Sequence, residues 1–185
     1  MNRAITFCFA LYDPERTFDW HNYAAHLWDG PVIHCEVFDK SEEFAYYITA
    51  ASQTVVRRKK FYGAGGWRFI TVVLDAEQYE RMIGYFSGIM AMRLRFSDTN
   101  IFCFPMNGCC CCTANRETIT CSELIAGMIQ HVWKLKLPHD PYMYTPNAVY
   151  ELVCDLLRQG KTKKSNIQGN PNEPAPNMFS LVQDK

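Results

Sequence analysis

The sequence lacks an excess of charge of either sign, and it lacks a long uninterrupted apolar run. Nineteen basic and nineteen acidic residues give a formal net charge of zero, which argues against electrostatic binding of nucleic acid. No apolar segment is long enough to span a bilayer as a helix. A small-residue cleavage site is also missing near the N-terminus, so no signal peptide is expected. These absences favour an intracellular protein without a transmembrane segment.

Paired cysteine motifs are scarce although cysteine itself is not. The nine cysteines are an odd number, and four of them stand together at 109–112. Such clustering does not resemble a disulfide framework and favours a reducing compartment, the cytoplasm. Cys109 and Cys112 have Cys-x-x-Cys spacing that Cys103 could complete as a zinc site, but no second such motif follows. Acylated or redox-active loop cysteines are a further alternative. We expect a loop near the active site, with no metal and no cofactor.

The chain predicts one α+β domain followed by a tail. An apolar content of 48% and an aromatic content of 14% in 185 residues are too high for a disordered protein. After Gly160 the composition changes to Lys, Asn, Pro, Gly and Gln, so we assign residues 1–160 to the domain and 161–185 to a mobile tail. A basic run at 57–60 is interpreted as a solvated strand end, and 96–117 as an irregular loop. Strands are expected at 4–11, 31–38, 44–51, 53–61 and 67–74, and helices at 17–27, from a cap at Asp75, at 120–133 and at 145–159.

Cys121 is the candidate nucleophile. Thr120 followed by Glu123 has the pattern of a capping box, which places Cys121 at the first position of a helix with Leu124, Ile125, Met128 and Val132 on one apolar face. Free backbone N–H groups and the positive end of the helix dipole lie there, so they lower a thiol pKa and can hold an oxyanion. The alternative is a small apolar residue that fills the start of a helix.

A thiolate nucleophile needs a proton acceptor, usually a histidine. His131 lies about 15 Å further along the same helix, and His139 follows a proline in a loop. His21 and His26 belong to the expected first helix. His34 lies in the middle of an expected strand, which is the rigid placement that catalysis favours. We therefore predict His34 as the base, with His26 as the fallback.

A third group usually orients the imidazole. Glu36 is two residues from His34, so both side chains leave the same face of the strand. Thr49 and Ser52, on the next expected strand, are rivals for this role. Any of the three could instead be ordinary sheet surface.

Several of these segments resemble the permuted NlpC/P60-like hydrolases of papain fold. The segment His34–Phe38 is similar to the family's His-Val-Glu-Leu/Ile-Phe strand, and 47–49 and 67–69 are similar to its next two strands. The segment Thr120–Ile125 resembles the family's Phe-Cys-Ser-Glu-Leu-Val nucleophile helix, and Thr145–Tyr150 its closing Ser-Pro-x-x-Leu-Tyr helix. Histidine precedes cysteine here, as in the permuted order. Tyr47 stands near the family's serine, so the third catalytic member stays open.

The resemblance implies a circularly permuted papain-like fold, in which a small antiparallel sheet packs on the helix of the nucleophile Cys121, with His34 as base. It implies a hydrolase that cleaves an amide or ester through an acyl-enzyme, with a peptide, isopeptide or acyl-lipid as substrate. A lipid acyltransferase and a non-catalytic binding or virion-structural module are the alternatives, because the family includes lecithin:retinol acyltransferase relatives and proteins of large DNA viruses. A virion-associated location is an alternative to the cytoplasm.

Overall fold

The computed structural model describes residues 2–14, 20–60, 62, 66–97, 117–160 and 163–164. These residues form an α+β structure with a small antiparallel sheet, as expected. The strands follow the order β4-β3-β2-β1-β5-β8, and every neighbouring pair is antiparallel. The sheet consists of β1 (Arg3–Leu11), β2 (Val32–Asp39), β3 (Phe44–Tyr47), β4 (Val56–Lys59), β5 (Trp67–Leu74) and β8 (Lys163–Lys164).

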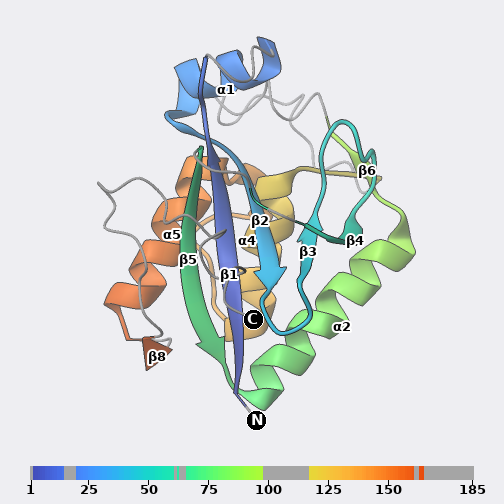
Figure 1. The fold of residues 1–185 in the computed structure, drawn as a ribbon, viewed down its shortest axis with the longest axis vertical. Coiled ribbons are helices and arrows are strands. Elements are labelled where there is room, and N and C mark those ends of the chain that lie inside the picture. The colour runs from blue at the N-terminus through green and yellow to red at the C-terminus, as the bar shows by residue number, and fades with distance from the viewer. Residues whose placement is uncertain are drawn as a thin grey trace, which may run out of the picture.

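Helices cover one face of this sheet. In Figure 1, α4 lies behind β1 and β2, α5 lies on the β5 side, α2 runs along the β3 and β4 side, and α1 lies across the end of the sheet. The helices are α1 (Trp20–Asp29), α2 (Ala76–Met92), α4 (Cys121–Trp133) and α5 (Pro146–Arg158), with a 3-10 turn η1 (Pro141–Met143). The main core lies between α2, α4 and α5 and the sheet face that they cover. A smaller cluster of Cys8, Phe38, Ala45 and Tyr62 covers the other face.

The local rules for helix ends hold at α2. The Asp75 side chain accepts from the Gln78 backbone N–H at 2.8 Å, and the Gln78 side chain accepts from the Asp75 N–H at 3.0 Å. This is the complete capping box, so α2 begins where its sequence predicts. Further along, Gly127 of α4 lies against Tyr85 of α2, and a Cβ there would collide with the phenol. The small residue therefore allows the two helices to pack closely.

The register of the sheet fixes which side chains share a face. Ala10 of β1 pairs with His34 of β2 and with Trp67 of β5, and the next row joins Cys8 with Glu36. Residues paired across strands project from the same face. His34 and Glu36 therefore lie on the face of the smaller cluster, whereas Cys35, between them, faces the helices.

Strand β3 is shorter than the expected strand at 44–51. It pairs with β2 only over Val37–Asp39, and the chain then turns, with the Gln53 N–H donating to the Thr49 carbonyl at 3.0 Å. The first half of β2 therefore has no strand paired on its β3 side among the described residues. This open edge is where the start of α4 approaches β2.

The beginning of β2 is tied to the beginning of α5. Thr145 caps α5 by accepting from the Ala148 N–H at 3.1 Å, and it donates to Asp29 at 2.6 Å. Asn147 accepts from the Val32 N–H at 3.3 Å. These bonds hold the strand two residues before His34, because they join the end of α1, the start of β2 and the start of α5.

Two short parallel strands, β6 (Arg95–Phe96) and β7 (Thr118–Ile119), were not expected from the sequence. They bring the chain back from α2 to the start of α4. The predicted cysteine loop lies mostly outside the described residues, since 98–116 are not among them. Most of the predicted tail also lies outside them. Of that tail, Lys163 and Lys164 pair with β5.

Candidate active site

Cys121 is the first residue of α4, as predicted. The Thr120 hydroxyl accepts from the Glu123 backbone N–H at 3.1 Å, which fixes the start of the helix. The expected apolar stripe packs into the core, since Leu124, Ile125, Met128 and Val132 are fully buried. Cys121 itself is 8% exposed. Its sulfur therefore lies beside the free N–H groups of the first helical turn.

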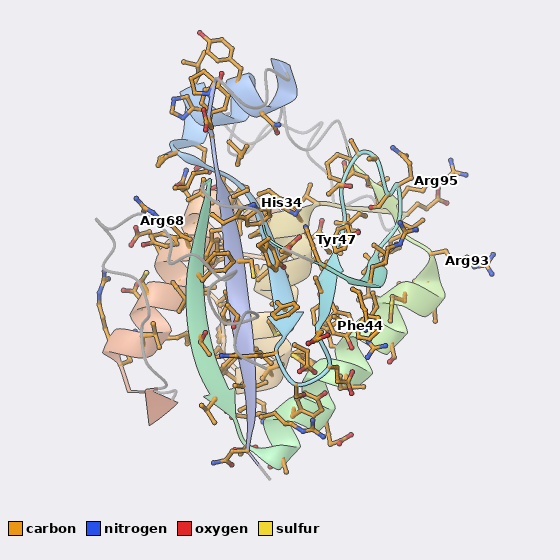
Figure 2. The ribbon with its side chains drawn as sticks, in the orientation of Figure 1. His34, Phe44, Tyr47, Arg68, Arg93 and Arg95 are labelled. Carbon is orange, nitrogen blue, oxygen red and sulfur yellow. The ribbon has the colours of Figure 1, made fainter. Side chains whose placement is uncertain are left out.

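The structure brings His34 and Cys121 together. Each side chain shifts the pKa of the other through charge and hydrogen bonding, although His34 projects from the sheet face opposite to α4. They meet because the edge of β2 is open where α4 begins, so a group at the start of that helix can reach residues from both faces. Figure 2 shows His34 on β2 where this strand passes the start of α4. The Trp67 ring stands edge-on to the imidazole, with 6.3 Å between ring centroids.

Cys35 is a second partner of Cys121, which the sequence did not reveal. Hydrogen bonding from its thiol and from its backbone N–H lowers the pKa of Cys121. The thiol hydrogen bond from Cys35 is the largest cause that lowers the pKa of Cys121. Burial opposes this effect, while the charge and hydrogen bond of His34 add to it, and the pKa lies well below its ordinary value. The favoured state of Cys121 is therefore the thiolate.

The electrostatics of His34 complement those of Cys121. Burial lowers the pKa of His34, but the charge and hydrogen bond of Cys121, followed by those of Glu36, raise it to about 9. At neutral pH this arrangement favours an imidazolium beside a thiolate. A proton donor and a nucleophile are thus formed together.

Glu36 supports the imidazole from behind. One of its carboxylate oxygens, Oε2, lies 3.4 Å from His34 Nε2. The carboxylate is fully buried, and it also accepts from Lys60 Nζ and from the Tyr62 hydroxyl. Burial raises the pKa of Glu36, but hydrogen bonds and charge from His34 and Lys60 lower it more. Glu36 therefore remains an ionised, fully bonded partner of His34.

Lys60 and Tyr62 are site residues that sequence reasoning missed. Lys60 ends the basic run interpreted as a solvated strand end, yet its side chain is only 25% exposed. Its ammonium lies over the rings of Tyr47, Trp67 and Tyr62, at 4.5, 5.0 and 5.4 Å from their centroids. No local pattern signals this inward turn, because the run carries four consecutive cations.

Thr49 and Ser52, the rivals of Glu36 for the third catalytic position, form hydrogen bonds with groups other than His34. Thr49 and Ser52 bond to each other in the turn after β3, with the Thr49 N–H donating to Ser52 Oγ at 2.9 Å and the Ser52 N–H to Thr49 Oγ1 at 3.1 Å. Ser52 Oγ also donates to the Thr54 carbonyl at 3.0 Å. Glu36 is thus the one of the three candidates that contacts His34.

The other histidines have different surroundings. His26 Nδ1 lies 3.2 Å from the Gly30 carbonyl, and its ring stacks on Tyr12 with centroids 4.6 Å apart. His131 packs against Tyr85 with centroids 5.7 Å apart, near the far end of α4. His139 follows α4 in the turn before η1. The side chain of His21 lies outside the described part of the structure.

A surface hollow of about 580 Å³ lies beside α4, lined by residues that include Tyr85, Glu123, His131 and Tyr142. Burial raises the pKa of Glu123 to about 7, although the Thr120 N–H lowers it. One Glu123 oxygen, Oε2, is buried without a hydrogen-bond partner. Neither Cys121 nor His34 lines this hollow, so it is separate from the thiol–imidazole pair.

Within the described ranges, no group of three or more His, Cys, Asp or Glu side chains is arranged to hold a metal ion. The proposed zinc ligands Cys103, Cys109 and Cys112 lie outside those ranges. No helix in the part of the chain that the structure describes has the length and apolar character needed to cross a membrane.

Fold and site together define an α+β protein that carries a thiol–imidazole–carboxylate series. Comparisons with protein-family models, with curated proteins and with solved structures find no match for this chain. An assignment of function therefore rests on the site itself and on the motifs of the sequence.

Proposed function

We propose that the chain is a thiol hydrolase of the permuted papain-like type, with Cys121 as nucleophile, His34 as general acid and base, and Glu36 as the group that orients His34. The observation that carries this proposal is that His34 Nε2 lies 3.4 Å from a Glu36 carboxylate oxygen, while the charge and hydrogen bonding of the same imidazole lower the pKa of Cys121. The order of the parts supports the family resemblance, because a histidine-bearing strand precedes a cysteine-bearing helix that packs on it.

The geometry supports an acyl transfer in two steps. The Cys121 thiolate attacks a carbonyl carbon, and the N–H groups at the start of α4 stabilise the oxyanion. The His34 imidazolium then gives its proton to the leaving amine or alcohol, and a thioester remains on Cys121. Neutral His34 next takes a proton from water, and the resulting hydroxide attacks the thioester. The acid product leaves, the Cys121 thiolate is regenerated, and His34 is again protonated.

The leaving group in this chemistry is an amine or an alcohol, and this defines the substrate class. An amide or an ester fits, so a peptide, an isopeptide or an acyl-lipid remains the proposed substrate. A lipid acyltransferase would use the same first step, and its acceptor in the second step would be an alcohol or amine in place of water. The two activities therefore differ in the acceptor and share Cys121, His34 and Glu36.

The test is a panel of acyl probes that carry ester, thioester and amide leaving groups. We expect the intact mass of the protein to show a transient acyl adduct, with the label on Cys121 by peptide mapping. Cys121→Ala should form no adduct. Cys154 is a matched control, since it is a half-buried thiol on α5 whose pKa is raised by burial, and Cys154→Ala should label as the unmodified protein does. Equal labelling of Cys121 and Cys154 would count against an activated nucleophile.

A further inference from the structure

Cys35 has no role in the acyl-transfer steps, yet it is a neighbour of the nucleophile in the core. Cys35 is on the face of β2 that packs against the helices, and Cys121 begins α4, which contacts β2; hydrogen bonding from Cys35 is the largest cause that lowers the pKa of Cys121. Both residues belong to one core cluster, and neither is in a disulfide. Two free thiols are therefore neighbours where α4 packs on β2, one at the start of α4 and one on β2.

We propose that Cys35 and Cys121 form a reversible oxidation site, in which a peroxide oxidises Cys121 and Cys35 then closes a Cys35–Cys121 disulfide. The proposal needs a reactive Cys121 but no acyl transfer, so it goes beyond the hydrolase activity. In the oxidised form Cys121 cannot act as a nucleophile, and a thiol reductant would restore it.

The two cysteines differ in the way that this sequence of steps requires. Cys121 is 8% exposed and Cys35 is fully buried, so a small oxidant in solvent meets Cys121 first. Cys121 is held as a thiolate, which is the form that reacts with peroxides. Burial, followed by the hydrogen bond and charge of Cys121, raises the pKa of Cys35 well above its ordinary value. Cys35 therefore stays a protonated thiol until Cys121 has been oxidised.

The chemistry balances with hydrogen peroxide as the oxidant. The Cys121 thiolate attacks one peroxide oxygen, an S–O bond forms, the O–O bond breaks, and the departing hydroxide takes the His34 proton to leave as water. The sulfur of Cys35 then attacks the sulfur of Cys121-sulfenic acid. An S–S bond forms, the S–O bond breaks, and the leaving hydroxide combines with the Cys35 proton as a second water. Two thiols lose two electrons, and one peroxide becomes two waters.

The fold makes the last step short. The two sulfurs have to approach to about 2.05 Å, the length of a disulfide bond. Cys121 is at the end of its helix, at the open edge of β2, so a change in its side-chain torsion does not disturb the helix core. Sulfenic acid that finds no thiol partner proceeds to sulfinic acid, which thiol reductants do not reverse. Cys35 would thus protect the nucleophile from irreversible oxidation.

The experiment treats the full chain with a small excess of hydrogen peroxide, blocks remaining thiols, and maps peptides without reduction. We expect a cross-linked Cys35–Cys121 peptide, loss of acyl-probe labelling, and recovery of labelling with dithiothreitol. Cys35→Ser is the matched variant, because a serine hydroxyl keeps a hydrogen-bond donor to Cys121 but cannot form a disulfide. In Cys35→Ser we expect oxidation of Cys121 to continue to sulfinic acid, with little recovery by dithiothreitol, and dimedone present during the peroxide treatment should trap the preceding sulfenic acid. Cys154→Ala should behave as the unmodified chain does.

Three results would overturn the proposal. One is sulfinic acid on Cys121 of the unmodified chain to the same extent as in Cys35→Ser. Another is a disulfide from Cys121 to one of the cysteines at 103 or 109–112. The third is full recovery of Cys35→Ser by dithiothreitol. Cross-link mapping of the unmodified chain decides the matter even if the variant fails to fold. A Cys35–Cys121 cross-link without any acyl-probe turnover would refute the hydrolase proposal and support the oxidation site. Acyl-probe turnover without a cross-link would refute the oxidation site and support the hydrolase.

Discussion

Replacing Glu36 with glutamine removes a buried negative charge and leaves the shape of the side chain almost unchanged. Glu36 is fully buried and accepts hydrogen bonds from His34, Lys60 and Tyr62. A hydrogen bond to a charged group contributes about 1.5–3 kcal/mol, and the glutamine oxygen can still accept from one or two of these donors. We therefore expect Glu36→Gln to lose about 2–4 kcal/mol of unfolding free energy, mainly because the partly buried Lys60 ammonium loses its counter-ion.

The same substitution should change the chemistry of Cys121. Glu36 helps to raise the pKa of His34, so its removal should lower that pKa and weaken the imidazolium that stabilises the thiolate. We expect the apparent pKa for alkylation of Cys121 by iodoacetamide to rise. Acyl-probe turnover should fall by about tenfold, less than the 10²–10⁴-fold typical of losing the acid–base group itself, because Glu36 acts through His34. Urea unfolding and residue-resolved alkylation across pH measure the two effects.

Asp39 provides the matched control on the same strand. It is also a fully buried carboxylate of β2, but it accepts from Ser41 and from the Tyr79 hydroxyl, the latter at 2.6 Å. Asp39→Asn should therefore destabilise the fold without moving the alkylation profile of Cys121. If Glu36→Gln and Asp39→Asn gave the same alkylation profile, the reasoning that makes Glu36 a partner of His34 would be refuted.

Three further predictions concern pH, the helix cap and the support of Glu36. The pKa of His34 is raised from 6.5 to about 9, so its stabilising contribution is complete below about pH 6.5 and is lost as pH rises through 9. The pKa of Cys121 is lowered, so its contribution is present above the ordinary thiol pKa of about 8.5 and is lost as pH falls through its lowered value. Between about pH 6.5 and 8.5 the two groups change the unfolding free energy with pH in opposite directions. Urea unfolding of the reduced protein should therefore give an unfolding free energy that does not vary with pH in this range, and a steady change there would contradict the ion pair. Thr120→Ala should cost about 1 kcal/mol through the lost cap and slow Cys121 alkylation, whereas Thr120→Ser should do neither. Tyr62→Phe should lose about 1.5–3 kcal/mol, because it removes a donor to the Glu36 carboxylate, and an unchanged urea midpoint would show that this bond contributes nothing.

Features set by neighbouring residues could be predicted from the sequence. The strand at 67–74 has its expected bounds, and the caps at Asp75 and Thr120 start α2 and α4 where expected. These follow from side chains bonding to backbone groups three residues away. Cys121 at the first helical position follows from the same local rule. The meeting of His34 with Cys121 does not follow from a local rule, since the two are far apart in the sequence. The placement of His34 on a strand and the resemblance in motif order suggested it.

The remaining features depend on tertiary contacts that have no local signature. Lys60 turns inward because a buried carboxylate and three aromatic rings surround its ammonium, and nothing in a run of four cations indicates which one does so. Strand β3 ends early because the chain turns at Thr49, although β-prone residues continue. His34 reaches Cys121 from the opposite face of the sheet because that early end leaves the edge of β2 open, and Cys35 is near Cys121 because α4 packs on β2.

The most direct measurement of the central claim is acyl-enzyme formation in His34→Ala. Intact-mass spectrometry of the unmodified chain, His34→Ala and His26→Ala, each treated with the same acyl probe, compares the rate at which Cys121 is labelled, and melting temperatures show whether each variant is folded. If His34 is the base, labelling of Cys121 in folded His34→Ala should fall 10²–10⁴-fold, while His26→Ala labels as the unmodified chain does. Undiminished labelling of Cys121 in His34→Ala would contradict the account.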